Sequence, residues 1–440
     1  MVTDEPKGRR ARSVPRGRVS RLAQFGRIAG GVAGGMMAEA ARRLADGERP
    51  QLRDMMLTPA NVARVADRLS HLRGAAMKLG QMISMDAGDV LPTELGEIMS
   101  RLRENAHQMP PAQLQRVLDR EWGTDWRGHF RDFEQRPIAA ASIGQVHRAT
   151  THDGRLLAIK VQYPGVRDSI DADVDNVAAL LRMSSLVPAD LGIAPLLAEA
   201  KRQLHEEADY LREGATMERF GTLLSTTPSL IVPTLEPSLT TANVLAMSFI
   251  EGIPIERLAT QDQTMRDGAM RALIASVLRE LFEFGLMQTD PNFANYRFQP
   301  ESGRLVLLDF GAVRPIDPAT AEGYRRLIHA ALANDREAVR NAAIAAGFLG
   351  AAAVARHTTS FDAMIDIALG ELHRSGPFDF GDRRFVGILR DQAVDVVTDR
   401  AAWHVPPADL LFVQRKISGT ALLAARLKAR VDVRDMLAAL

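Results

Sequence analysis

The stretch LMQTDPNFANYRFQPESGRLVLLDFG, Leu286–Gly311, contains three polar side chains of the kind found in metal–phosphate sites. Asp290 and Asn295 form the pattern D-x4-N, and Asp309 opens the triplet Asp-Phe-Gly. Either motif alone is also common turn chemistry, so neither decides a function by itself. The interval between Asn295 and Asp309 has room for one short hairpin, which predicts that both side chains meet at the mouth of one cleft.

Phosphoryl transfer needs a positioned nucleotide, a metal that neutralises phosphate charge, and a carboxylate near the acceptor hydroxyl. Mg²⁺ prefers oxygen ligands, which Asn295 and Asp309 can supply, and Asp290 fits the acceptor side. Upstream, Lys160 in the apolar run LLAIKV could hold two phosphate groups, although a lysine on an exposed strand edge fits the same pattern. Glu213 could pair with Lys160, although a glutamate on a solvated helix face is equally compatible.

Three features occur in this order: a lysine in an apolar strand, a D-x4-N loop and Asp-Phe-Gly. Each alone is a weak signal, but together they indicate a kinase-like nucleotide site. Three features differ from ordinary protein kinases. Gln288 and Thr289 precede Asp290 in place of His-Arg, and no A-P-E follows Asp309 because the chain turns helical almost at once. The alanine-rich Ile138–His147 replaces a glycine-rich loop, and its Cβ atoms limit how closely backbone amides approach a phosphate. We therefore expect the peptide-docking activation segment to be missing.

The composition is that of a globular chain long enough for two domains or one large bilobal unit. It has 440 residues, 46% hydrophobic and 25% charged, with a formal net charge of +1. This charge balance gives no reason to expect nucleic acid as a partner. The absence of cysteine excludes disulfides, thiolate metal sites and cysteine nucleophiles, and it suits a reducing compartment.

The hydrophobic pattern predicts helices, then a small β-rich lobe, then a large helical lobe. Met265–Leu286 is predicted to be a strong helix with Phe282 on its apolar face and Glu280 off that face. The other predicted elements are a helical segment over 50–130, strands on both sides of the turn Thr151–Gly154, helices over about 166–224, and strands in SLIVPTL, NVLAMSFIEG and RLVLLDFG.

The N-terminal segment combines eight basic residues between Lys7 and Arg27 with the small-residue stretch Ile28–Ala41. That stretch is too short and too rich in glycine to span a membrane, so we predict no transmembrane helix. It lacks the leucine-rich core of a signal peptide. Two interpretations stay open: a disordered basic tail with a surface helix, or reversible attachment to an anionic membrane.

The sequence resembles the UbiB family of atypical kinase-like proteins, the AarF-domain group, and most of all its coenzyme Q biosynthesis branch. The resemblance runs from about Val19 to the C-terminus, through RGAAMKLGQM, AAASIGQVH, AIKVQYPGV, EADYLREG, ELFEFGLMQTDPNFANY and LLDFGAVR. It implies an α+β, bilobal protein-kinase-like fold, predominantly helical, with a helical N-terminal extension. The implied domains are a basic tail and small-residue helix (1–50), the extension with K-x-G-Q (51–135), a kinase-like N-lobe with a helical insert (136–251) and a helical C-lobe (252–440).

The resemblance also implies roles for individual residues. Lys78, with Gln81, would lie on an extension helix that reaches into the cleft, fills the space of a peptide substrate and takes part in catalysis with Lys160 and Asp290. The residues implied to bind ATP and Mg²⁺ are the loop Ala139, Ala140, Ala141 and Ser142, the pair Lys160 and Glu213, the hinge Ser248, Phe249, Ile250 and Glu251, and the metal ligands Asn295 and Asp309. Glu207 and Asp209 match the family's E-x-D element.

The family supports ubiquinone synthesis, with ATPase behaviour and association with membrane lipid. We therefore expect an ATP- and Mg²⁺-dependent atypical kinase or ATPase in that process. Its expected partners are nucleotide, a lipid or quinone-precursor ligand, quinone-biosynthesis proteins or a second copy of the chain, and a membrane touched through residues 20–45. The expected location is the cytoplasm, at the inner face of a membrane. The alternatives are a small-molecule or lipid kinase, and a nucleotide-switched pseudokinase scaffold.

Overall fold

The computed structural model describes residues 109–183, 194–399, 404 and 406–440. The chain divides into two compact units, with boundaries after Ala215, Pro233 and Phe249. Unit 1 contains the described residues up to 215 and residues 234–249, and unit 2 contains 216–233 and the described residues from 250 on. The predictions for Lys78, Gln81, Ile28–Ala41 and the rest of 1–108 lie outside the described residues.

Unit 1 is built on a five-stranded antiparallel sheet with the order β1-β3-β4-β6 and β2 beside β3. The strands are β1 Phe130–Phe133, β2 Ala139–Ala140, β3 Gly144–Thr151, β4 Leu156–Gln162 and β6 Val244–Ser248. The hairpin predicted around Thr151–Gly154 is confirmed, since Thr150 pairs with Leu156 across that turn. Strand β4 lies between β3 and β6 and is buried from Leu157 onward, which explains why all its residues except Lys160 and Gln162 are apolar.

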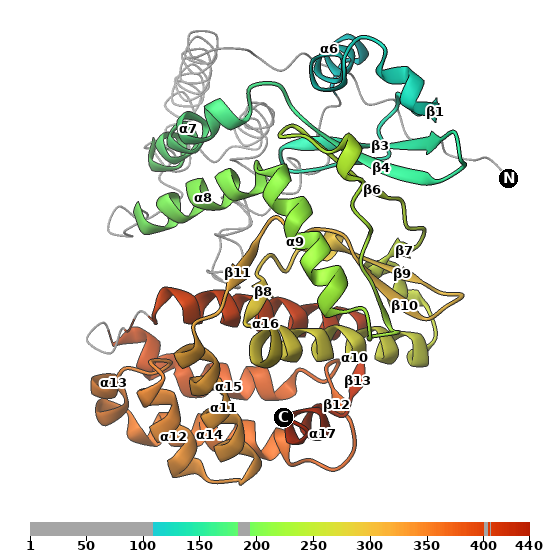
Figure 1. Cartoon of the computed structure of the whole chain (residues 1–440). Coiled ribbons are helices and arrows are strands. Elements are labelled where there is room, and N and C mark those ends of the chain that lie inside the picture. Colours follow the sequence, from blue (N-terminus) through green and yellow to red (C-terminus); the bar gives the residue numbers. More distant parts are fainter. Residues whose placement is uncertain (1–108, 184–193, 400–403, 405) are drawn as a thin grey trace, which may run out of the picture. The chain divides into compact units, whose positions relative to one another are not determined.

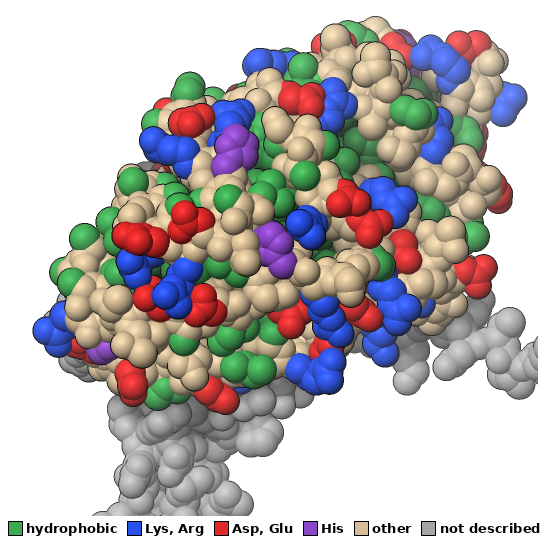
Figure 2. Space-filling model, turned by 90° about the horizontal axis from the view of Figure 1, so that it is seen from below, with side chains coloured by type: hydrophobic (Ala, Val, Ile, Leu, Met, Phe, Trp, Pro, Cys, Tyr) green, Lys and Arg blue, Asp and Glu red, His purple; other side chains and the backbone are tan. Residues whose placement is uncertain are grey.

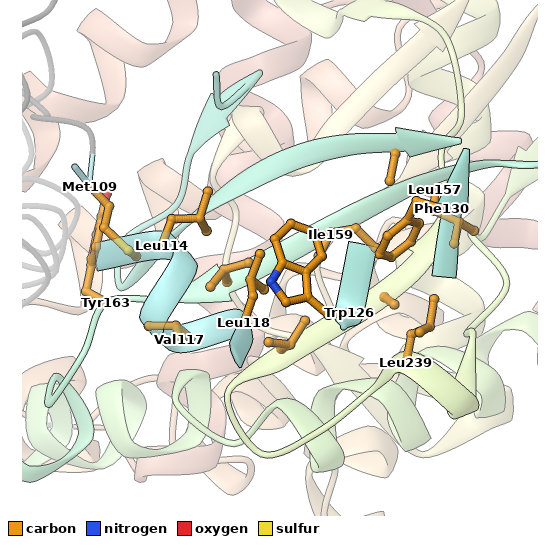
Figure 3. Packing of buried hydrophobic residues seen from close by; sticks show 14 residues of the cluster. Met109, Leu114, Val117, Leu118, Trp126, Phe130, Leu157, Ile159, Tyr163 and Leu239 are labelled. Carbon is orange, nitrogen blue, oxygen red and sulfur yellow. The ribbon is translucent and has the colours of Figure 1, made fainter. Parts of the chain in front are cut away.

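A hydrophobic cluster fixes β4 against the helix α6, Pro111–Trp122. Figure 3 shows Trp126 beside Leu118 of α6 and Ile159 of β4, and none of the three is more than 1% exposed. The Trp126 indole N–H donates to Asp119 at 3.1 Å, so its polar atom is also satisfied. Helix α6 ends at Trp122 and is followed by Gly123, which has a positive φ of 86°. The strand that bears Lys160 is therefore held by a dense core.

His147 of β3 is buried and uses both ring nitrogens. Nδ1 lies 2.8 Å from the carbonyl oxygen of Glu134, which can only accept, so Nδ1 bears the proton. Nε2 lies 2.8 Å from the amide nitrogen of Gln145, which can only donate, because the Gln145 oxygen accepts from the Met109 N–H. The network therefore requires a neutral ring, and burial lowers the pKa of His147.

We expect this network to make unit 1 less stable in acid. The folded pKa lies below the unfolded value of about 6.5, so the unfolded chain binds a proton first as the pH falls. The stabilisation is present above pH about 6.5 and declines toward the folded pKa, by at most ~1.4 kcal/mol per pH unit. Urea unfolding followed by Trp122 and Trp126 fluorescence should show this decline. His147→Gln should show a shallower pH dependence, and an equal slope in both proteins would contradict the assignment.

The helical region predicted over 166–224 is confirmed in its described part, which contains α7 Ile170–Met183, α8 Ala194–Glu207 and α9 Tyr210–Leu223. Figure 1 shows α8 and α9 following one another along the chain. The break between them lies at Ala208–Asp209. The Asp209 carboxylate accepts the Arg212 backbone N–H at 3.1 Å, which satisfies a free donor at the start of α9.

Unit 2 begins its main helical part with α10, Gln263–Arg279, which continues as a π-helical turn over Glu280–Phe284. The predicted helix extended to Leu286, and this end is wrong: Gly285 adopts a left-handed conformation (φ 59°) that stops the helix. Leu286 instead begins β8, Leu286–Gln288, which pairs with β11, Val313–Pro315. A four-stranded sheet has the order β5-β10-β9-β7 and consists of β5 Leu230–Ile231, β7 Ile253–Pro254, β9 Tyr296–Gln299 and β10 Arg304–Leu307.

The rest of unit 2 is mostly helical, as predicted. Figure 1 shows α10 side by side with α16, Ala408–Leu427. The remaining elements are α11 Pro318–Leu332, α12 Arg336–Ala345, α13 Ala351–Arg356, α14 Thr358–Leu372, β12 Phe378–Asp379, α15 Arg384–Thr398, β13 Arg430–Val431 and α17 Val433–Ala438. Helix α11 starts soon after β11, which confirms the early helical turn predicted after Asp309.

Figure 2 shows acidic and basic side chains interspersed on one face of the molecule. Acidic and basic side chains also form ion pairs between helices: Arg340–Asp362 at 2.6 Å and Arg336–Asp366 at 2.8 Å link α12 to α14. Among the described residues, no helix combines the length and the hydropathy that a membrane span requires.

Candidate active site

The first group of candidate residues is an ion pair inside unit 1. Lys160 of β4 is 8% exposed, and its Nζ lies 3.0 Å from both carboxylate oxygens of Glu213 on α9. Glu213 itself is 2% exposed, and the Tyr210 ring lies 5.0 Å from Nζ. The predicted pairing is therefore confirmed. The competing interpretations, an exposed strand-edge lysine and a solvated glutamate, are wrong.

Two glycines permit the close backbone approach that this ion pair requires. A Cβ on Gly144 would lie 2.4 Å from the carbonyl oxygen of Val161, next to Lys160. A Cβ on Gly214 would lie 3.0 Å from the Leu235 side chain, so this glycine lets α9 pack closely beside Glu213. Glycine thus stands at two points of close packing beside the ion pair: β3 against β4 next to Lys160, and α9 against Leu235 next to Glu213.

The alanine-rich loop is a tight turn anchored to α8. Ala139 and Ala140 are exposed on β2, and the Ala141 N–H donates to the Gly144 carbonyl at 2.9 Å. The Ser142 hydroxyl donates to Glu207 at 2.6 Å. Glu207 of the E-x-D element therefore holds the loop that was predicted to cover nucleotide phosphates.

We expect Ala141→Gly to change the ratio of ATP to ADP affinity several-fold. Removal of this Cβ frees the turn that Ala141 closes and lets its N–H approach a phosphate more closely. Titration of the purified protein with each nucleotide would measure both dissociation constants. Ala172→Gly, at an exposed position of α7 outside the predicted nucleotide loop, is the control. An unchanged ratio in Ala141→Gly would show that the alanine serves packing only.

The predicted hinge coincides with a place where the chain passes between the units. Ser248 ends β6, and its hydroxyl accepts the Thr234 N–H at 2.9 Å. The Phe249 N–H donates to the Leu156 carbonyl at 2.8 Å, and the boundary between the units follows Phe249. Ile250 is the first residue beyond that boundary. In unit 2 the Glu251 carbonyl accepts from Gln299 at 2.9 Å. Contact of these residues with adenine stays a prediction.

The second group of candidate residues lies inside unit 2, at the open end of the β9–β10 hairpin. Tyr296 pairs with Leu307, and the Leu308 N–H donates to the Asn295 carbonyl at 2.9 Å. Asn295 lies directly before β9 and Asp309 lies two residues after β10, at the same end of the hairpin, so the predicted hairpin is confirmed. The Asp309 carboxylate is half-buried and accepts the Gly311 N–H at 3.0 Å.

Asn295 connects the loop to the hairpin through its amide. It is 8% exposed, and its Nδ2 lies 3.3 Å from the Asp290 carboxylate. Its Oδ1 accepts no hydrogen bond from the described residues, so a lone-pair oxygen stays free for a cation. Within the described ranges, no cluster of three His, Cys, Asp or Glu could hold a metal.

A buried polar network behind this loop was missed from the sequence. Glu280 is 2% exposed, although it was predicted to lie off the apolar face of its helix. Its carboxylate accepts from the Ser276 hydroxyl and the Gln288 N–H, each at 2.9 Å. Lys416 of α16 is 1% exposed and donates to Gln288 at 2.8 Å and to the Tyr296 hydroxyl at 2.9 Å. Lys416 is 128 residues from Gln288 in the chain, so no local pattern indicates the contact.

These features define the class of protein: an α+β, mostly helical protein of the protein-kinase type, with a β-strand lysine, a D-x4-N loop and Asp-Phe-Gly. A family model described as "ABC1 atypical kinase-like domain" matches residues 101–343. The chain belongs to this family, the UbiB family indicated by its motifs.

Two relatives are similar in sequence over nearly the whole chain, and one solved structure is similar in fold over 84% of it. "Atypical kinase COQ8, mitochondrial" of Saccharomyces cerevisiae is 36% identical over 424 residues, 95% of this chain and 84% of that protein. "Atypical kinase COQ8B, mitochondrial" of Rattus norvegicus is 37% identical over 437 residues, 97% of this chain and 81% of that protein. The structure of Rv3197 with erythromycin, from Mycobacterium tuberculosis, has a TM-score of 0.58 at 27% identity, covering 84% of this chain and 92% of that one.

Proposed function

We propose that this protein is an ATP- and Mg²⁺-dependent atypical kinase or ATPase that supports ubiquinone biosynthesis. The observation that supports it most strongly is the end of the β9–β10 hairpin. There Asn295 lies beside the strand end that leads to Asp309, and its Nδ2 lies 3.3 Å from the Asp290 carboxylate. A protein that only binds other proteins has no chemical need for all three side chains.

Each residue has a role that its chemistry suits. Asn295 and Asp309 would hold Mg²⁺, which neutralises phosphate charge when bound. Lys160 would contact phosphate oxygens as a point charge, and Glu213 fixes the position of its Nζ. Asp290 would take the proton from the attacking water or hydroxyl as the terminal phosphoryl group leaves ADP.

The proposed role in ubiquinone synthesis rests on sequence similarity to the COQ8 relatives. The yeast and rat COQ8 relatives match this chain over 95% and 97% of its length, so the resemblance is not limited to the nucleotide-binding motifs. A strain that lacks the gene should lose ubiquinone. The wild-type gene should restore the quinone content and Asp309→Asn should not. Normal quinone content without the gene would contradict this part of the proposal.

The biochemical test uses the purified full chain and ATP labelled in its γ-phosphate. We expect release of labelled phosphate that needs Mg²⁺ and stops when EDTA is added. Transfer of label to a lipid extract would instead support a lipid kinase. Nucleotide binding without turnover, with or without lipid, would support a pseudokinase scaffold and contradict the proposed activity.

A further inference from the structure

Residues of helix α16 contact the loop that contains Asp290 and Asn295. Lys416 donates to Gln288, two residues before Asp290, and to Tyr296, the residue after Asn295. One buried ammonium group therefore joins the two ends of the loop. The lysine lies beyond residues 101–343, the part of the chain that the family model matches.

Further contacts on α16 reach the loop between these two ends. A Cβ on Gly419 would lie 2.2 Å from Cβ of Pro291, so the helix backbone packs directly on the residue after Asp290. The Arg426 guanidinium lies 5.9 Å from the centre of the Phe293 ring. Lys416, Gly419 and Arg426 are three and seven residues apart, so they share one face of the helix. The whole loop thus rests on a single helical surface.

Charge strengthens this arrangement. Burial by itself lowers the pKa of Lys416, but the negative charge of Glu280 and the Tyr296 hydroxyl outweigh it, so the pKa is raised and the ammonium stays charged. Gln288 lies between the two charges: its N–H donates to Glu280 and its side-chain oxygen accepts from Lys416. If the network opened, Lys416 or Glu280 would remain buried with fewer hydrogen-bond and charge partners, which costs free energy. The network therefore favours one fixed arrangement of these side chains.

We infer that Lys416 is a positioning residue: from α16 it fixes Gln288 and Tyr296 and thereby sets the geometry of the loop that presents Asp290 and Asn295. The effect on turnover rests on the proposed function. The effect on the order of the loop does not, because it can be measured without nucleotide.

The test compares the wild-type chain with Lys416→Met, Tyr296→Phe, the double variant and Leu427→Ala. Lys416→Met keeps the length of the side chain and removes the ammonium, whereas Leu427→Ala opens a cavity at the far end of the same helix. We expect Lys416→Met to raise amide hydrogen exchange in peptides over 286–299 by about tenfold or more. We expect kcat to fall about 10- to 100-fold and KM for Mg-ATP to rise as well, because the loop presents both Asp290 and Asn295. The double variant should be no worse than Lys416→Met, since both changes break one network.

Leu427→Ala separates positioning from general stability. It should lower Tm without selective exchange at 286–299. Wild-type exchange at 286–299 in folded Lys416→Met, or a fall in kcat no greater than that of Leu427→Ala, would overturn the inference. If Lys416→Met does not fold, Tyr296→Phe decides: unchanged exchange and unchanged kcat there would also overturn it. If the wild-type chain shows no turnover, the proposed function fails, and hydrogen exchange alone decides the role of Lys416.

Discussion

Asp309→Asn is expected to lower Mg²⁺-dependent phosphate release by about 10³-fold. A metal ion supplies several kcal/mol of charge stabilisation in the transition state, and each 1.4 kcal/mol is about tenfold in rate. Asparagine is nearly the same size and retains an oxygen that can accept the Gly311 N–H, which Asp309 now accepts at 3.0 Å. The local turn should therefore persist and Tm should change little, so the lost rate reports the lost charge.

A matched control exists in the same unit. Asp379 accepts the Gly381 N–H at 2.9 Å, the same two-residue turn that Asp309 makes with Gly311. Asp379→Asn should leave phosphate release unchanged. Steady-state rates of both variants over a range of Mg²⁺ concentrations give the comparison. An unaltered rate in Asp309→Asn would remove the metal role of this carboxylate.

The parts of the site that the sequence predicted correctly depend on local pattern. The alternation and turn residues of Gly144–Gln162 specify the hairpin that bears Lys160, and the short interval from Asn295 to Asp309 specifies the β9–β10 hairpin. The Lys160–Glu213 pair spans 53 residues, so composition and periodicity could not select Glu213 from the other helical glutamates. Only the family motif singled it out.

The parts that the sequence missed depend on irregular geometry and distant contact. The helical pattern assumed about 3.6 residues per turn throughout, but Glu280–Phe284 forms a π-helical turn that rotates the following side chains. Phe282, expected on the apolar face, is only partly buried. Glu280 begins this turn, and regular spacing already puts it on the face of Leu273 and Val277, seven and three residues before it, so the prediction that it lies off that face was wrong for a different reason. Lys416 is a lysine in a long helix, and such residues are usually exposed. Its burial follows from tertiary contacts with Gln288 and Tyr296 alone.

Glu213→Ala is expected to lower the unfolding free energy of unit 1 by about 3–5 kcal/mol. Lys160 is 8% exposed, and the variant deprives its ammonium of the carboxylate that now lies 3.0 Å away. Breaking one side of a buried ion pair is costly because the remaining charge cannot regain its hydration. Urea unfolding monitored by tryptophan fluorescence in a Trp403→Phe background, in which the remaining tryptophans Trp122 and Trp126 both belong to unit 1, measures the loss.

The double variant Lys160→Met, Glu213→Met separates stability from chemistry. Well-packed apolar side chains of similar size replace a buried ion pair at little or no net cost, so the double variant should regain most of the stability that Glu213→Ala loses. Phosphate release should nevertheless stay as low as in Lys160→Met, because neither side chain can then contact phosphate as a charge. A stable double variant with wild-type turnover would show that the pair serves the fold alone, and the phosphate role proposed for Lys160 would have to be abandoned.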